Sequence, residues 1–220
     1  MMDARCPQTY AEVLDTLFEN YPELCACEAE VRAAASTVLG SFRSGGKLLV
    51  CGNGGSAADS EHTVGELMKS FRFKRPVDPA FADAYREANG AEAPSWLEGA
   101  LPAISLVSQT ALSTAFGNDE AAVGVFAQQV YGYGEAGDVL LAISTSGNSA
   151  NVVEAAKVAR AKGVKVVSLT GSRESALTGL SDVCVRVPRD EVFRIQELHL
   201  PVYHALCAAV EAEIFGGAGE

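Results

Sequence analysis

The residues best suited to proton transfer are two histidines and a glutamate in two distant segments. The chain has three histidines, and one of them, His62, lies four residues before Glu66. Residues four apart share one face of a helix, so an imidazole and a carboxylate would project together. Gln196 and His204 are eight apart in the last helical segment, where about 100° per residue leaves them about 80° apart. This set could transfer protons, hold a metal ion, or do both.

Two turns rich in small polar residues could bind a phosphate group. Residues 52–56 read Gly-Asn-Gly-Gly-Ser and residues 144–149 read Ser-Thr-Ser-Gly-Asn-Ser, each between an apolar run and a helical pattern. Glycines let the backbone approach a ligand, and a helix N-terminus offers unpaired N–H groups and a positive dipole end. Helix capping explains one hydroxyl per helix. The second turn has four hydroxyls, so we predict that it binds a phosphate monoester.

The composition limits the possible functions. A chain of 220 residues with 48% hydrophobic and 20% charged residues is typical of one globular domain. Its net charge of −11 argues against nucleic-acid and anionic-membrane partners. Neither turn has the G-x-G-x-x-G or G-K-[ST] pattern, so no nucleotide cofactor is expected.

We expect a cytoplasmic protein. The first ten residues have no basic patch followed by an apolar run. No apolar stretch approaches the roughly 20 residues that cross a bilayer. The six cysteines lack zinc or redox spacing and are expected to be free thiols.

Strands and helices alternate along the chain. Helices are predicted at about 8–43, with a break at Pro22, and at about 57–71, 150–162 and 191–215. Buried strands are predicted at 47–51, 138–143, 164–169 and 183–187. This alternation predicts a three-layer α/β/α sandwich with a mainly parallel, five-stranded sheet, plus N-terminal helices. Both polar turns should lie at the C-terminal ends of strands, where open α/β sheets bind ligands.

Residues 74–102 do not fit a compact α/β unit. The segment has four prolines and the only tryptophan, Trp96. We predict an insertion with one short helix. Trp96 could cover a substrate pocket, but we favour a role in pinning the insertion to the body of the protein.

At these motifs the sequence resembles the SIS-domain phosphoheptose isomerases. The resemblance rests on GNGGSAADSEH at 52–62 with Glu66 behind it, AFGND at 115–119, GDVLLAISTSGNSANVVEAA at 137–156 and RIQELHLPVYH at 194–204. It implies an SIS domain at 44–220, with the insertion at about 74–102. It also implies that residues 1–43 are a helical segment packing in a homotetramer, with active sites at subunit interfaces.

The resemblance further implies an aldose–ketose isomerase. Its substrate would be sedoheptulose 7-phosphate, converted to D-glycero-D-manno-heptose 7-phosphate or a stereoisomer by 1,2-proton transfer. Glu66 would be the base and His204 the acid. One zinc ion per subunit would be held by His62, Glu66, Gln196 and His204. Substrate contacts would come from Asn53, Gly54, Gly55, Ser56, Glu66, Asn118, Asp119, Ser144, Thr145, Ser146, Ser149 and Gln196.

Two alternatives stay open. One is a non-catalytic SIS protein that binds a sugar phosphate or a partner protein, and the other is an isomerase of a shorter ketose phosphate. Besides the insertion, the sequence departs from some family members at Ser70 and Phe193, where they carry Arg and Asp. These differences leave the sugar and its stereochemistry open.

Overall fold

Five short strands form one parallel sheet in the order β2-β1-β3-β4-β5. The structure is a computed structural model that describes residues 9–216. The strands are β1 (Leu48–Cys51), β2 (Ala103–Ser105), β3 (Val139–Ile143), β4 (Lys165–Thr170) and β5 (Val183–Arg186). The predicted parallel five-stranded sheet is confirmed. The sequence analysis did not predict β2, because three residues are too few to show a periodic pattern.

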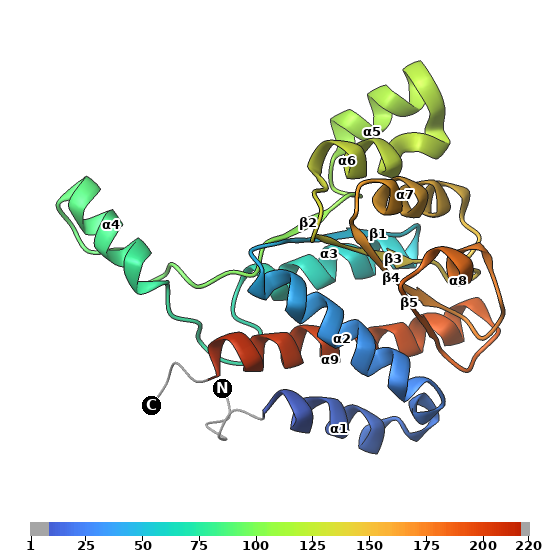
Figure 1. Ribbon diagram of the computed structural model, residues 1–220, viewed down its shortest axis with the longest axis horizontal. Helices are drawn as coiled ribbons and strands as arrows, with labels where there is room; N and C mark the ends of the chain where they lie inside the picture. The colour runs from blue at the N-terminus through green and yellow to red at the C-terminus, as the bar shows by residue number, and fades with distance from the viewer. Residues whose placement is uncertain (1–8, 217–220) are drawn as a thin grey trace.

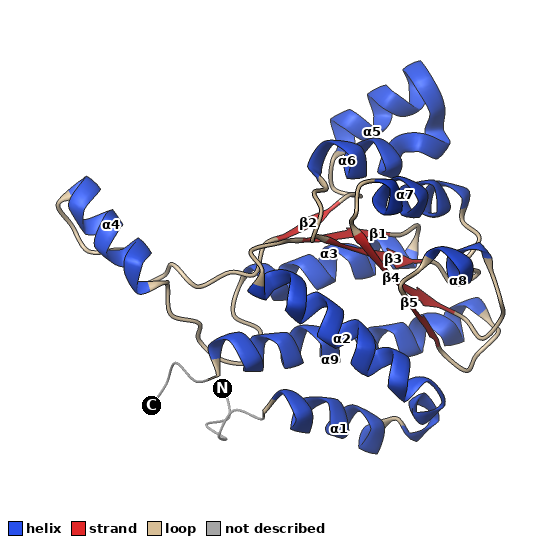
Figure 2. Cartoon of the chain, viewed as in Figure 1, coloured by secondary structure: helices blue, strands red, loops and turns tan. Residues whose placement is uncertain are grey.

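Helices cover both faces of the sheet (Figures 1 and 2). α1, α2, α3 and α9 share a core with one face, whereas α6, α7 and α8 share a second core with the other. The helical elements are α1 (Tyr10–Asn20), η1 (Pro22–Cys27), α2 (Glu28–Arg43), α3 (Gly55–Met68), α4 (Pro79–Asn89), α5 (Thr110–Phe116), η2 (Gly117–Ala121), η3 (Ala122–Gly124), α6 (Val125–Tyr133), α7 (Ala150–Ala161), α8 (Ala176–Leu180) and α9 (Val192–Phe215). The predicted three-layer arrangement is therefore confirmed, and α5, α6 and α8 add to the predicted helices.

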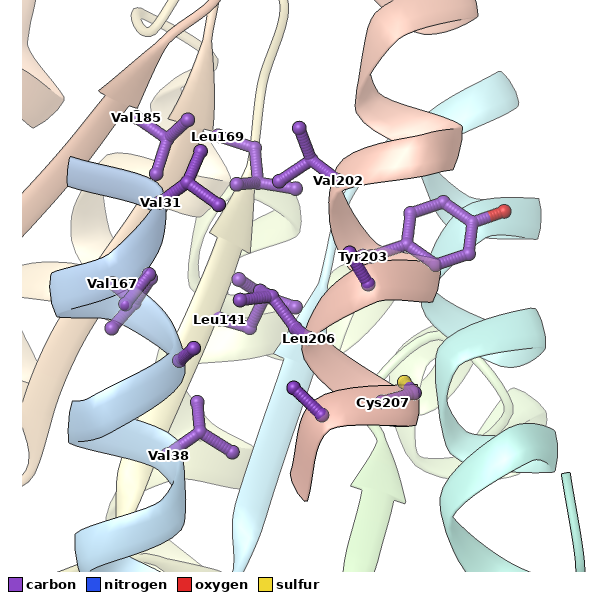
Figure 3. Packing of buried hydrophobic residues seen from close by; sticks show 14 of the residues in the cluster. Val31, Val38, Leu141, Val167, Leu169, Val185, Val202, Tyr203, Leu206 and Cys207 are labelled. Carbon is purple, nitrogen blue, oxygen red and sulfur yellow. The ribbon is translucent and has the colours of Figure 1, made fainter. Parts of the chain in front are cut away.

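The larger core fixes α2 and α9 on the sheet. Figure 3 shows Val31 and Val38 of α2 among the apolar side chains of β3, β4, β5 and α9. Valine side chains buried this fully stabilise a fold by about 1.5–3 kcal/mol each. The apolar residues of α1, including Leu14 and Leu17, are also buried within the same chain. The apolar stripes of residues 9–43 are thus covered without a partner, so they do not by themselves require an oligomer.

The insertion forms an arm that projects from the body (Figure 1). Its helix, α4, begins at Asp78, whose carboxylate accepts hydrogen bonds from the Ala80 and Phe81 amides. None of its residues is buried. The predicted short helix is confirmed. The prediction that Trp96 pins the insertion to the body is wrong for the single chain, because this residue is 75% exposed.

No helix between residues 9 and 216 combines the length and apolarity that a membrane span requires.

Candidate functional site

The two polar turns lie side by side at the C-terminal edge of the sheet. They follow β1 and β3, which pair directly, with Cys51 opposite Ala142. The side-chain amides of Asn53 and Asn151 exchange two hydrogen bonds of 2.9 Å and tie the first turn to α7. Gly54 has a φ of +57°, a conformation that side chains disfavour. Adjacent parallel strands therefore bring together turns that are about 90 residues apart in the sequence.

In the second turn the hydroxyls do not cap the following helix. Ser149 is the N-cap of α7, but its side chain makes no capping hydrogen bond. Its hydroxyl is instead hydrogen-bonded to that of Ser144, at 2.9 Å. The Ser146 hydroxyl accepts a hydrogen bond of 3.2 Å from the Asn148 amide. Capping thus does not explain why hydroxyls gather here.

This turn lines a cavity of about 240 Å³. Thr145 and Ser146 form one side of it, and Arg173 and Arg189 are also among its lining residues. The arginines are paired with carboxylates, Arg173 with Asp190 and Arg189 with Glu23. The sequence analysis did not single out these arginines, because nothing in their local sequence marks them. Glu174 and Asp190 also line the cavity, so its guanidinium groups are balanced by carboxylates.

The candidate acid–base residues meet between α3 and α9. His62 Nε2 lies 3.1 Å from Glu66 Oε1, and His62 Nδ1 lies 3.0 Å from the Tyr203 hydroxyl. Lys69 Nζ donates to Glu66 Oε2 at 3.0 Å. Both carboxylate oxygens of Glu66 are therefore engaged and held in a defined orientation. The predicted shared face of His62 and Glu66 is confirmed.

His204 packs against the same cluster. Its ring centroid is 4.9 Å from that of His62 and 5.5 Å from that of Phe71. Its Nε2 is buried and has no hydrogen-bond partner among the described residues. Desolvation lowers the pKa of His204 and the adjacent His62 lowers it further, although Glu66 acts in the opposite direction. Both the burial and the neighbouring imidazole favour the neutral form of His204.

Gln196 lies next to the first turn. A Cβ atom on Gly55 would be only 2.5 Å from Gln196 Nε2, so any other residue there would displace the Gln196 side chain. His199, by contrast, faces the sheet: it is fully buried and its Nε2 is 3.2 Å from the Thr170 carbonyl oxygen. His199 therefore faces β4, whereas His204 on the same helix packs against His62.

Other predicted substrate residues are placed differently. Ser56 is buried at the start of α3. Asn118 and Asp119 lie in η2, are exposed, and hydrogen-bond to each other at 2.8 Å. His204 lines a second cavity, of about 340 Å³, between α1 and α9. The residues lining that cavity do not include the serine turn.

Sequence reasoning missed two residues of the cluster. The Tyr203 hydroxyl donates to Asp59 Oδ1 at 3.3 Å while contacting His62. Burial raises the pKa of both Tyr203 and Asp59, and Asp59 raises that of Tyr203 further. Their spacing offered a signal, because Asp59 is three residues before His62, and Tyr203 is seven after Gln196.

The four predicted zinc ligands do not form a ready-made metal site. The His204 Nε2 atom is unpartnered, which suits a ligand, but both ring nitrogens of His62 already contact protein groups. Across residues 9–216, no three His, Cys, Asp or Glu side chains are placed to hold one ion. In this arrangement His62 would have to exchange one of its present contacts before the four side chains could hold a zinc ion.

Comparison with known proteins agrees with this fold. The family model described as the SIS domain matches residues 10–101 and 84–171. The chain is 40% identical over 196 residues to the phosphoheptose isomerase of Rhodospirillum rubrum, covering 89% of this chain and 92% of that protein.

Solved structures lead to the same group. A phosphoheptose isomerase from Francisella tularensis has a TM-score of 0.71 at 30% identity, covering 93% of this chain and 95% of that one. One from Neisseria gonorrhoeae has a TM-score of 0.68 at 33% identity, covering 91% and 94%. The chain belongs to the SIS domain family and, within it, to the phosphoheptose isomerases.

Proposed function

We propose that this protein interconverts sedoheptulose 7-phosphate and an aldoheptose 7-phosphate, D-glycero-D-manno-heptose 7-phosphate or a stereoisomer. The observation that carries the proposal is the meeting of Glu66, His62 and His204 between two helices. The hydroxyl-rich turn at the C-terminal edge of the sheet offers a place for the phosphate. An aldose–ketose isomerase needs a base at carbon, a proton carrier at the oxygens and an anchor for the phosphate.

Glu66 is the proposed base. It would take the proton from the carbon next to the carbonyl, which leaves an enediolate, and return it to the neighbouring carbon. His62 and Lys69 each donate to or contact one carboxylate oxygen, so the group is oriented before substrate arrives. Such positioning lowers the barrier because little reorganisation remains at the moment of reaction.

His204 is the proposed proton carrier at the oxygens. A neutral imidazole can donate its N–H to one substrate oxygen while its other nitrogen accepts a proton. The lowered pKa of His204 favours this neutral form. His204 would thus move protons between the C1 and C2 oxygens while Glu66 moves the carbon-bound proton.

The serine turn is the proposed phosphate site. Ser144, Ser146 and Ser149 supply hydroxyls, and the Ser149 side chain caps none of the first amides of α7. A phosphate monoester would complete the hydrogen bonds of these donors. Because the phosphate is the same on every candidate substrate, this part of the site sets affinity more than it selects the sugar.

Zinc is a separate proposal. His62, Glu66, Gln196 and His204 would hold the ion only after His62 exchanged one of its present contacts, and bound zinc would polarise the substrate oxygens. Metal analysis of protein purified without a histidine tag, together with activity after chelation, tests this role. Full activity in a metal-free sample would exclude it.

We also propose a cytoplasmic homotetramer whose active sites lie at subunit interfaces. The separation of the serine turn and His204 into two cavities of the single chain supports a site completed by a neighbouring subunit. Light scattering at micromolar concentration measures the assembly, and a monomer would contradict it.

A screen of purified protein against C5 to C7 ketose phosphates tests the function. NMR should detect an aldose only with the seven-carbon substrate, and in D₂O the product should carry deuterium at the carbon that gains the proton. Turnover of a shorter sugar alone would change the substrate assignment. If no sugar phosphate is converted, the protein is a binding protein rather than an isomerase.

A further inference from the structure

A fully buried ion pair joins the two helices that carry the candidate acid–base residues. Arg75 and Glu211 both have 0% exposed side chains, and Arg75 Nε donates to Glu211 Oε1 at 2.7 Å. Arg75 lies at the start of the insertion, and Glu211 lies on α9, seven residues after His204. The pair is therefore anchored on the acid's helix.

The other nitrogens of Arg75 hold the end of the base's helix. Nη2 donates to the carbonyl oxygen of Glu66 at 2.8 Å, and Nη1 donates to that of Leu67 at 2.6 Å. These carbonyls belong to the last turn of α3, where helix carbonyls lack intrahelical partners and a positive charge is favourable. The backbone of Glu66 itself is thus held by the guanidinium.

Glu211 completes the link from the other side. Its two oxygens accept hydrogen bonds from the Phe71 and Arg72 amides, at 2.8 and 2.9 Å. These amides follow α3 directly, so the chain leaving the base's helix is tied to α9 as well. Phe71 in turn contacts the His204 ring.

Stability alone is a weak explanation for such a pair. Removing two charges from water costs free energy that their attraction often fails to recover, and apolar replacements of similar volume can be neutral or stabilising. Proton transfer, in contrast, is sensitive to position, since a misplacement of about 1 Å can reduce a rate about 100-fold.

We propose that Arg75 and Glu211 are positioning residues that set the separation of Glu66 and His204. The inference rests on the proposed function. The guanidinium of Arg75 fixes the end of α3, and the carboxylate of Glu211 fixes the segment that follows α3. Because Glu211 is part of α9, both contacts hold α3 in place against α9.

The test compares Glu211→Gln and the double variant Arg75→Met/Glu211→Met with a matched control, Asp138→Asn. Asp138 is also a buried carboxylate that accepts two backbone amides, those of Lys47 and Glu135, and pairs with a cation, Lys47. It lies at the opposite, N-terminal edge of the sheet. Steady-state kinetics are measured at a temperature at which circular dichroism shows every variant folded.

We expect kcat to fall about 10- to 100-fold in Glu211→Gln and in the double variant, with KM little changed. Asp138→Asn should lower the melting temperature and keep the parental kcat. Arg75→Lys, which keeps the charge but has fewer hydrogen-bond donors, should have a kcat between those of the parent and the double variant. Parental kcat in the folded Glu211→Gln and double variants, or an equal fall in Asp138→Asn, would overturn the proposal.

A crystal structure of the double variant separates this inference from the proposed function. A changed distance between the Glu66 carboxylate and the His204 ring supports positioning even if the parent converts no sugar phosphate. An unchanged distance overturns it, whatever the parent's activity. If the parent converts none of the substrates but the distance between Glu66 and His204 changes in the variant, only the proposed function is contradicted.

Discussion

The serine turn and the cluster between α3 and α9 are built in different ways. The turn is six consecutive residues, 144–149, placed by the end of one strand and the start of one helix. The cluster joins His62 and Glu66 to Tyr203 and His204, which are about 140 residues further along the chain. A contiguous turn can bind a group that never changes, such as a phosphate. Groups that exchange protons with a substrate must be placed from more than one side.

If this contrast is correct, the largest effect will come from the cluster. Glu66→Gln keeps size and polarity but cannot accept a proton, so kcat should fall by about 10²–10⁴. His204→Gln should reduce kcat comparably, because the oxygens lose their proton carrier. Steady-state kinetics and circular dichroism on folded protein measure both.

His199 is the matched control, because it lies on the same helix but faces β4. His199→Gln should cost less kcat than either variant of the cluster. Parental turnover in Glu66→Gln would show that another group is the base.

His199 also predicts a pH dependence of stability. Burial lowers its pKa from 6.5 to about 4. Between these values the unfolded chain binds a proton and the folded chain does not, so stability is complete above pH 6.5 and falls as the pH drops towards 4. The free energy of unfolding falls by about 3 kcal/mol in total, because each unit of the pKa shift corresponds to about 1.4 kcal/mol.

Urea unfolding at a series of pH values should show this loss in the parent. His199→Gln cannot titrate and should have a flatter profile over the same range. Equal slopes in both proteins would place the acid sensitivity elsewhere.

The serine turn should affect binding rather than rate. Ser146→Ala and Ser149→Ala should each raise KM with little change in kcat, because a hydrogen bond to a charged phosphate contributes about 1.5–3 kcal/mol. Competition by inorganic phosphate provides a second measure of the same site. A fall in kcat with unchanged KM would place the turn in the chemistry and remove the contrast between the two regions.

The smallest effect is expected from the arm, which belongs to neither region. Trp96→Ala should change the free energy of unfolding by no more than about 0.5 kcal/mol, because the side chain is exposed. Phe81→Ala in α4 serves as a second exposed position in the same arm. A loss above about 2 kcal/mol would show that the arm is covered in the assembled protein.

Local pattern alone determined much of this protein. The alternation of apolar runs and helical periods was sufficient to predict the parallel sheet, because buried strands and amphipathic helices each show a pattern within a few consecutive residues. The spacing of His62 and Glu66 placed them on one face for the same reason. The glycine and serine turns were evident because their residue types are unusual together.

Tertiary structure decided what spacing cannot express. The Ser149 hydroxyl, at the start of α7, is hydrogen-bonded to Ser144 and does not cap the helix. The packing of two strands brought Asn53 next to Asn151. Trp96 looked like an anchor by composition, yet the base of the arm is held by Arg75, whose partner Glu211 is 136 residues away. Sequence determines which groups a helix presents, but which helices face one another depends on the packing of the whole core. That packing placed His62 and Glu66 beside His204.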